Sequence, residues 1–298
     1  MALEYNNTML SPLSVKPVDY LVIGHVTKDL TPEGSTMGGT VAYAGLTARS
    51  LGLSVGVVTA WGTDISLEPL RTATVLGTTT QTTTTFANRE TQNGRIQTLY
   101  HVAPPLNIEL VPQIWYKTPI VHLGPVAQEV DPSLRKLFSA QLLCATPQGW
   151  LRDWDSQGHV RPSPWETASE ILPQMDAVVL SIDDLAGDRA WGKTLASQAR
   201  LMVITEGANG ATVYWQGREE HIPAPTVHEV DPTGSGDIFA AAFFIHFHHS
   251  GDAWNAARFA TALASQSVTR PGLAGVPTPQ EVKRILPVTL TDEQELTN

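Results

Sequence analysis

The sequence contains a single cysteine, Cys144, among its 298 residues. One thiol cannot form a disulfide framework within the chain, and it cannot build a metal site from several cysteines. The neighbours of this cysteine, Leu142, Leu143 and Ala145, are apolar, which predicts a buried strand. We therefore expect Cys144 to be a core residue.

Positive charge is also scarce. The chain has 19 Lys and Arg residues against 29 Asp and Glu, a formal net charge of -10 and a sequence pI of about 5.3. The field of such a chain repels polyanions, so neither nucleic acid nor an anionic membrane is an expected partner. No run of about 18 apolar residues occurs, and residues 1–17 lack a basic segment followed by an apolar one. These absences lead us to expect a cytoplasmic protein.

Apolar and charged residues are present in the proportions of an ordinary globular protein, at 42% and 16%. A chain of this length can form one large α/β domain. It shows no internal repeat, no long linker and no break in composition, so we expect a single domain over residues 1–298.

Short apolar runs alternate with longer helical segments along most of the chain. We predict strands at 20–23, 54–59, 120–123, 142–146, 177–182, 201–205, 211–215 and 226–230, and helices at 41–51, 133–140, 235–249 and 252–269. A further helix is predicted near Pro164, with Ser163 as its N-cap and Glu166 three residues after the cap. This alternation predicts a mainly parallel sheet with helices on both faces, where ligands bind at the carboxyl ends of the strands.

Two polar, β-prone segments interrupt this alternation, a threonine-rich one at 78–86 and another at 95–102, with Asn93 and Gly94 as a turn signal between them. They predict a β-hairpin outside the main sheet. Its two-faced polar character fits a lid or an oligomer interface, and an exposed structural ribbon is the alternative.

The most informative segment is residues 231–237, Asp-Pro-Thr-Gly-Ser-Gly-Asp, which opens an almost wholly apolar helix. Gly234 and Gly236 allow a tight turn, and the first N–H groups of a helix have no partner within it. These amides and the positive end of the helix dipole predict an anion hole that suits a phosphoryl group in transfer.

Asp237 lies in the same first turn, where a carboxylate can accept the proton of an attacking hydroxyl. The helix dipole is expected to keep it ionised. The alternative is that Asp231 caps the helix and the glycines only make a turn. No Gly-x-x-x-x-Gly-Lys-Ser/Thr motif occurs, and Phe239 stands where a dinucleotide fingerprint has its third glycine, which excludes a nucleotide-dependent oxidoreductase.

The seven residues 231–237, called the heptad below, resemble the C-terminal signature of the PfkB family of carbohydrate kinases. The resemblance implies that Asp237 is the catalytic base and that Gly234, Ser235 and Gly236 form the anion hole, with Thr233 on the nucleotide side. Residues 205–211 resemble the nucleotide-side glycine segment of the family, which assigns nucleotide binding to Thr205, Gly207 and Gly210. A glycine-rich hairpin turn is the alternative for that segment.

A second match begins at Gly38 and Gly39 and resembles the N-terminal glycine motif of the family. It implies that Gly38 and Gly39 allow close approach of the substrate and that Asp29 binds substrate hydroxyls, since a carboxylate accepts two hydrogen bonds from a diol. Tyr43 stands where many members have asparagine. The sequence therefore does not choose among an aldose, a nucleoside and a cyclic polyol such as inositol as the phosphoryl acceptor.

Two further residues follow predicted strands on the expected ligand side. Asp184 lies where the family often has Asn-x-x-Glu, which implies a role in organising Mg²⁺ through water, with a solvent-exposed helix cap as the alternative. Arg152 follows the strand at 142–146, where it could clamp phosphate by bidentate bonding or belong to a packed surface loop with Trp150 and Trp154.

The resemblance implies a three-layer α/β/α sandwich of the ribokinase type, with a mainly parallel central sheet and a small β-sheet lid near 28–37 and 78–104. The implied function is ATP-dependent phosphorylation of a hydroxyl on a sugar-like molecule, with ATP and Mg²⁺ as cofactors and a monovalent cation left open. Lids in this family sometimes pair, so a homodimer through the lid is an expected assembly. The alternative is a protein with the fold of this family but weak catalytic activity, which acts by binding nucleotide or sugar or as a regulatory protein.

Overall fold

The computed structural model describes residues 15–32, 34–91 and 94–286, and within them a nine-stranded central sheet. Its strands are β1 (Tyr20–Ile23), β4 (Val55–Gly62), β5 (Thr74–Thr80), β8 (Ile120–Leu123), β9 (Leu142–Ala145), β12 (Ala177–Ser181), β13 (Leu201–Thr205), β14 (Ala211–Trp215) and β15 (Arg218–Ile222). They lie in the order β15-β14-β13-β12-β9-β8-β1-β4-β5. The strands from β13 to β5 pair in parallel, whereas β14 and β15 are antiparallel at one edge.

Alternate residues of the parallel strands supply two separate cores. In β1, Tyr20 and Val22 belong to the core on one face, while Leu21 and Ile23 belong to the core on the other. Successive side chains of a strand point to opposite faces, so a strand that is apolar throughout must be covered on both. The short apolar runs in the sequence therefore become the middle layer of a three-layer sandwich.

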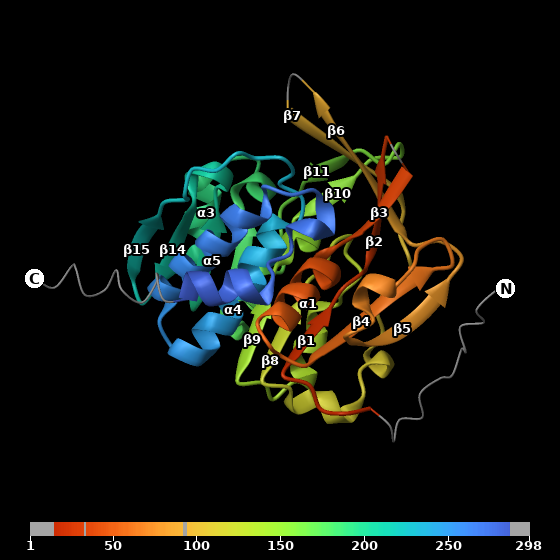
Figure 1. Ribbon diagram of the computed structural model, residues 1–298, viewed down its shortest axis with the longest axis horizontal. Helices are drawn as coiled ribbons and strands as arrows, with labels where there is room; N and C mark the ends of the chain where they lie inside the picture. The colour runs from red at the N-terminus through yellow and green to blue at the C-terminus, as the bar shows by residue number, and fades with distance from the viewer. Residues whose placement is uncertain (1–14, 33, 92–93, 287–298) are drawn as a thin grey trace, which may run out of the picture.

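Three helices cover the first face: α1 (Thr40–Ser50), α4 (Ser235–Ser250) and α5 (Ala253–Ser267) (Figure 1). The helix α4 is apolar on nearly every side because it is buried among the sheet, α1 and α5. The opposite face is covered by the short helices α2 (Ala168–Ile171) and α3 (Arg189–Ala196) and by several 3₁₀ turns.

A four-stranded sheet stands beyond the carboxyl ends of the central strands (Figure 1). It consists of β2 (Thr27–Thr31), β3 (Gly34–Gly38), β6 (Thr84–Thr91) and β7 (Gly94–His101), in the order β3-β2-β6-β7. We call this sheet the lid. A small hairpin, β10 (Arg152–Trp154) with β11 (Val160–Pro162), docks on its β7 edge, where the Leu99 amide donates to the Gly158 carbonyl at 2.8 Å.

The structure confirms the predicted three-layer architecture, the parallel sheet and the separate lid. The division of the threonine-rich segment was wrong, because residues 78–80 belong to β5 in the central sheet and only the part from Thr84 onward enters the lid. The predicted strand at 226–230 was also wrong. The carboxyl end of this segment is bound to the loop after α5, since the amides of Val230 and Asp231 both donate to the Val268 carbonyl.

Two predicted helices differ from the structure. Residues 133–140 contain only a 3₁₀ turn, Pro132–Leu137, capped by the Asp131 side chain. The helix expected at Pro164 begins at Ala168, because the Ser163 amide continues the hairpin by donating to the Leu151 carbonyl. The turn predicted at Asn93 and the polar leader up to residue 14 lie outside the described residues. No helix in the described part of the chain is long and apolar enough to cross a membrane.

Candidate active site

A cleft of about 1150 Å³ lies between the carboxyl ends of the central strands and the lid. Every site residue predicted from the sequence lines this cleft except Gly38. Gly38 lies directly behind Asp29, since a Cβ atom on Gly38 would stand 2.1 Å from Asp29 Oδ2. Gly39 has φ +86° and begins α1 with its backbone against the His25 carbonyl, so two glycines let the lid and α1 meet at the cleft.

The start of α4 presents the predicted anion hole. Gly234 is the N-cap in a left-handed conformation, with φ +77°, and no side chain within the described residues caps this end of the helix. Asp231 is not the cap: its carboxylate accepts from the Thr233 amide at 2.9 Å and from the Gly272 amide at 2.7 Å, which ties two loops together. Ser235 and Gly236 line the cleft at the positive end of the helix dipole, but the Ser235 amide is already engaged, since it donates to the Pro232 carbonyl at 3.1 Å.

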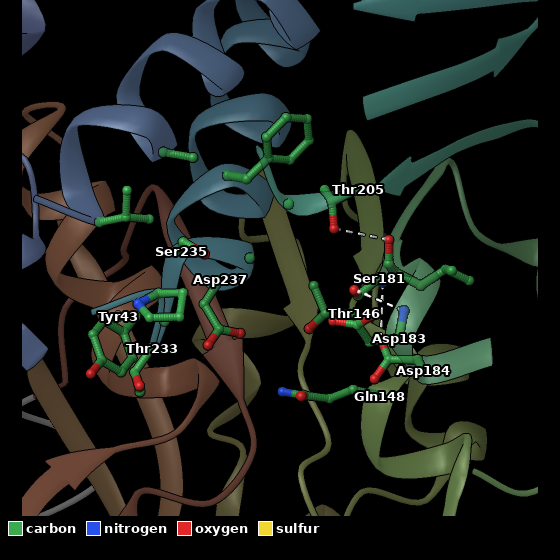
Figure 2. Close-up of a pocket in the computed structure, with 18 of the residues that line it drawn as sticks. Tyr43, Thr146, Gln148, Ser181, Asp183, Asp184, Thr205, Thr233, Ser235 and Asp237 are labelled. Carbon is green, nitrogen blue, oxygen red and sulfur yellow. Dashed lines mark hydrogen bonds between the residues drawn. The ribbon is translucent and has the colours of Figure 1, made fainter. Parts of the chain in front are cut away.

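Asp237 lies in the first turn of α4 and faces the floor of the cleft (Figure 2). Burial raises its pKa to about 6, and the nearby carboxylates Asp184 and Asp29 act in the same direction. A hydrogen bond from Thr40 and the charge of Arg152 oppose the rise. Asp237 was expected to be ionised, and a pKa of about 6 leaves it ionised at neutral pH although burial raises the value.

Three side chains form a hydrogen-bonded series that ends at Asp237. Arg152 Nη2 donates to Gln148 Oε1 at 3.0 Å, and Gln148 Nε2 donates to Thr40 Oγ1 at 3.1 Å. The Thr40 hydroxyl therefore keeps its proton for Asp237. Its methyl group is fixed as well, because it occupies the space of a missing side chain at Gly124, where a Cβ atom would lie 2.4 Å from Thr40 Cγ2.

Asp184 and Arg152 lie close together on one wall of the cleft, with 3.5 Å between Asp184 Oδ1 and Arg152 Nη2. Asp184 Oδ2 accepts from the Ser181 amide in a capping box, so the helix-cap interpretation is correct, but the side chain is only 13% exposed. Burial raises the pKa of Asp184, and Arg152 opposes that rise. Arg152 is 15% exposed and is thus part of the cleft wall rather than a surface loop.

The oxygen atoms of Asp184 suit Mg²⁺, a hard cation that keeps several waters. Both of these oxygens already have protein partners, Arg152 and the Ser181 amide. No group of three or more His, Cys, Asp or Glu residues that could hold a metal is found in the described part of the chain. The residues fit a magnesium ion that is held mainly by a phosphate ligand and reaches Asp184 through water.

The lid contributes Asp29 from β2, with Asn88 and Gln97 from β6 and β7 lining the cleft beside it. Asp29 Oδ1 accepts from the Thr27 hydroxyl at 2.9 Å, and Gln97 Oε1 accepts from Arg152 Nη1 at 3.2 Å. Asn88 and Gln97 were not predicted from the sequence. Their position on the inner face of a polar hairpin was the signal, but pairing across the lid was needed to identify that face.

The glycine segment at 205–211 is a hairpin turn between β13 and β14, closed by the Glu206 amide donating to the Gly210 carbonyl at 2.7 Å. The alternative interpretation is therefore correct for its geometry. Thr205, Gly207 and Gly210 nevertheless line the cleft at the end away from the lid. The same end is lined by Val268 and by residues that were not assigned to the site from the sequence: Ala224, Pro225, Thr226, Val227, Glu229, Val230, Thr261, Ala264 and Ser265.

Tyr43 is buried in the first turn of α1, with a side chain that is 2% exposed. Its ring lies beside Thr233 and away from Asp184 and Gln148 (Figure 2). A Cβ atom on Gly234 would be 2.3 Å from Tyr43 Cδ1. The structure thus places Tyr43 against the glycine turn of the anion hole.

Comparison with known proteins agrees with this geometry. Residues 165–280 match the model of the pfkB family of carbohydrate kinases. The chain is 39% identical over 95 residues to ribokinase from Bacillus subtilis (strain 168), which covers 32% of each protein. It is 28% identical to inositol 3-kinase from Oryza sativa subsp. japonica, over 90% of this chain and 73% of the relative. The chain thus spans only about a third of the length of the first of these relatives.

Solved structures show the same fold. A pyrophosphate-dependent kinase of the ribokinase family, determined as a sulfate complex, has a TM-score of 0.75 at 22% identity and covers 89% of this chain and 99% of its own. Ribokinase from Arabidopsis thaliana, complexed with ribose and ATP, has a TM-score of 0.67 at 16% identity and covers 91% of this chain and 99% of its own. The protein therefore has the ribokinase-type fold. Its sequence is similar to kinases of this family, and residues 165–280 carry the match to the pfkB family model.

Proposed function

We propose that this protein transfers the γ-phosphoryl group of Mg-ATP to a hydroxyl of an uncharged, sugar-like molecule, with Asp237 as the general base. The observation that carries the proposal is the position of Asp237. It stands in the first turn of α4, next to the uncapped amides and in the same cleft as Asp29 of the lid. Its pKa of about 6 makes it an ionised acceptor for the proton of the attacking hydroxyl at neutral pH.

The reaction is an in-line displacement. Asp237 takes the proton of the acceptor hydroxyl, whose oxygen forms a bond to the γ-phosphorus while the bond to the leaving ADP oxygen breaks. The amides of Gly234 and Gly236 and the positive end of the α4 dipole stabilise the charge on the phosphoryl oxygens, whereas the Ser235 amide donates to the Pro232 carbonyl and holds the turn. The lid covers the acceptor and keeps water, the competing nucleophile, away from the phosphoryl group. Magnesium bound to the phosphates supplies charge neutralisation.

ATP as donor is supported by the end of the cleft away from the lid. Apart from Glu229, the side chains there are small or apolar, and they come from α5 and from the irregular segment after β15. A phosphate held at the start of α4 would leave this space for a nucleoside, with Ala264 and Val268 on the α5 side. An apolar slot with few polar groups suits a nucleobase, whereas pyrophosphate alone would leave it unused.

The charges in the cleft support an uncharged acceptor. Asp29, Asp184 and Asp237 are close enough for the pKa of Asp237 to rise in response to the other two, and Arg152 is already engaged by Asp184 and Gln148. A phosphorylated or carboxylated sugar would add negative charge beside these carboxylates. A neutral polyol instead supplies hydroxyl donors to them.

The test is an ADP-release screen over aldoses, nucleosides and inositols, with Asp237→Asn as the control. We expect turnover with at least one uncharged polyol, and a loss of about 10²-fold or more in the variant, in line with removal of a general base. Near-normal turnover by Asp237→Asn would show that the base is wrongly assigned. Ligand-dependent thermal stabilisation without ADP release from any acceptor would instead support a binding or regulatory protein.

A homodimer through the lid is the assembly that we propose. Ile96 and Tyr100, four residues apart on β7 and therefore on one face of the strand, are 48% and 64% exposed. Sedimentation analysis of the wild type and of Tyr100→Glu tests this, and a wild type that is monomeric at every concentration would rule it out.

A further inference from the structure

A buried series of polar side chains crosses the central sheet beneath the cleft. Tyr20 Oη on β1 lies 2.7 Å from His122 Nδ1 on β8, and His122 Nε2 lies 2.8 Å from Thr146 Oγ1, just after β9. Tyr20 and His122 are fully buried, and the His122 ring meets the ring of Phe244 on α4 edge to face at 5.1 Å. The reaction described above uses none of these three residues.

The imidazole of His122 is uncharged at physiological pH. Burial in this apolar layer lowers its pKa to about 3. A neutral imidazole has one donor nitrogen and one acceptor nitrogen, so His122 must donate to one neighbour and accept from the other. The donors in this series of hydrogen bonds therefore all point the same way, either from Tyr20 toward Thr146 or from Thr146 toward Tyr20.

The Tyr20 hydroxyl decides which direction it takes. Among the described residues, His122 is the hydrogen-bond partner recorded for this fully buried hydroxyl. If Nδ1 carried the proton, the hydroxyl would accept from it and its own proton would be left unsatisfied, at a cost of about 1–3 kcal/mol. If Nδ1 is bare, Tyr20 donates to it, and the proton without a protein partner is that of Thr146, which lines the cleft instead of lying fully buried. The second arrangement puts the imidazole proton on Nε2.

The consequence reaches the cleft at Thr146. With the proton on Nε2, His122 donates to Thr146 Oγ1, so the proton of the Thr146 hydroxyl is free to point elsewhere. Thr146 lines the cleft and is 6% exposed. Figure 2 shows it between Asp237 and Asp184. Within the described part of the chain no other hydrogen bond is recorded for this hydroxyl, so its proton is available to a ligand.

We propose that the Thr146 hydroxyl donates a hydrogen bond to the phosphoryl group in transfer, and that Tyr20 and His122 act as positioning residues that keep it a donor. This inference rests on the proposed phosphoryl transfer. A phosphoryl group presents three oxygens, and the amides of α4 approach it from the helix side only. Thr146 approaches from the sheet side.

Several other donors at the floor of the cleft are already committed, and the Thr146 hydroxyl is held in place by the buried Tyr20 and His122. Gln148 donates to Thr40, Thr40 to Asp237, and Arg152 to Gln148 and Gln97. The carboxylates of Asp29, Asp184 and Asp237 repel phosphoryl oxygens. A donor held in place by buried neighbours offsets part of that repulsion at no cost of reorganisation.

Titration calorimetry with Mg-AMP-PNP and with Mg-ADP isolates the contact, because ADP lacks the γ-phosphoryl group. We expect Thr146→Val to weaken Mg-AMP-PNP binding by about 10-fold or more, the loss of one hydrogen bond to a charged group, and to leave Mg-ADP unchanged. Thr146→Ser keeps the hydroxyl and should bind both like the wild type. Thr47→Val is the matched control, because the buried Thr47 hydroxyl on α1 has no partner among the described residues and lies outside the cleft.

The positioning role has its own readout. Tyr20→Phe frees His122 to carry its proton on either nitrogen, so we expect weaker Mg-AMP-PNP binding, by less than in Thr146→Val, with Mg-ADP unchanged. A purely structural role would lower thermal stability and weaken both nucleotides alike. Long-range ¹⁵N–¹H NMR of the His122 ring reports the protonated nitrogen directly. A proton on Nδ1 in the wild type would overturn the inference.

The failure of this inference can be told apart from failure of the proposed function. If the wild type binds Mg-AMP-PNP more tightly than Mg-ADP and Thr146→Val does not alter that preference, Thr146 makes no phosphoryl contact. If the wild type binds neither nucleotide, the same comparison is made with inorganic pyrophosphate and phosphate. Binding of none of the four probes would overturn the proposed phosphoryl transfer and this inference with it.

Discussion

The ring of Tyr43 fills the space that a side chain on Gly234 would occupy. A Cβ atom at that position would lie 2.3 to 2.4 Å from three carbon atoms of the ring, far inside van der Waals contact. Gly234 also has φ +77°, a conformation that L-residues other than glycine adopt only with strain. The N-terminal glycine motif and the C-terminal heptad therefore meet in one contact, which fixes the turn carrying the anion-hole amides.

We expect Gly234→Ala to reduce kcat/KM by about 10²-fold or more, because the displaced turn carries its amides away from the phosphoryl group. Tyr43→Ala removes the clash but leaves the strain at φ +77°. The double variant should therefore recover part of the lost kcat/KM. In urea unfolding, the free energies of unfolding of the four proteins should give a coupling energy of about 1–3 kcal/mol between the two residues. Strictly additive effects would show that the two residues do not constrain each other.

The pH dependence of kcat/KM should show an acid limb near pH 6, because Asp237 must be ionised to accept a proton and its pKa is raised to about 6. Asp184→Asn removes a like charge that raises this pKa, so the limb should move to lower pH. Arg152→Gln removes a charge that lowers it, so the limb should move to higher pH. Glu68→Gln, at an exposed carboxylate outside the cleft, is the control and should leave the limb in place.

Thr40→Val should move the same acid limb upward by about 1 pH unit, since the hydrogen bond of Thr40 favours ionised Asp237 and such a bond contributes about 1.5–3 kcal/mol. Thr40→Ser keeps the hydroxyl and should retain the wild-type profile. A loss of activity in Thr40→Val with an unshifted limb would mean that Thr40 matters for packing against Gly124 alone.

Donor preference can be tested at Ala264 on α5, which lines the end of the cleft assigned to the nucleoside. We expect Ala264→Phe to weaken Mg-ATP by about 10-fold or more by filling that space, and to leave binding of inorganic pyrophosphate unchanged. Pyrophosphate is the internal control, because it needs only the anion hole. If pyrophosphate supports turnover and Ala264→Phe has no effect on ATP, the donor assignment is wrong.

The sequence was sufficient for the architecture because apolar runs such as 120–123 are buried on both faces whatever their neighbours. It was not sufficient where distant backbone groups decide the conformation. Residues 226–230 alternate like a strand, but bonds to the Val268 carbonyl hold their end in an irregular segment. At Pro164 the chain is likewise held by a distant group, since the Ser163 amide donates to the Leu151 carbonyl, and α2 begins only at Ala168.

The candidate site divides in the same way. Asp237, Gly234 and Asp29 could be predicted because their motifs are local. Gln148 could not, because its role depends on Thr40, which is 108 residues away in the chain. Asn88 and Gln97 required the register of β6 and β7, which places both on the inner face of the lid.

The raised pKa of Asp237 also predicts an effect on stability. A carboxyl whose pKa is higher in the folded protein than in the unfolded chain stabilises the fold at low pH, and that contribution is lost as pH rises from about 3.8 to about 6. Ionised Asp237 therefore destabilises the fold at pH 7.5, by roughly 3 kcal/mol at most. We expect Asp237→Asn to raise the unfolding midpoint at pH 7.5 and to leave it nearly unchanged at pH 4.

Asp19 provides a control of opposite sign for this prediction. Hydrogen bonds from the Ser54 side chain and backbone lower the pKa of Asp19, so its contribution is present above the unfolded pKa and is lost as pH falls. Asp19→Asn should lower the midpoint at pH 7.5, whereas Asp237→Asn raises it. Thermal unfolding of both variants at the two pH values measures the contrast. If Asp237→Asn is no more stable than the wild type at pH 7.5, the cleft does not hold Asp237 in the strained, ionised state that the proposed base requires.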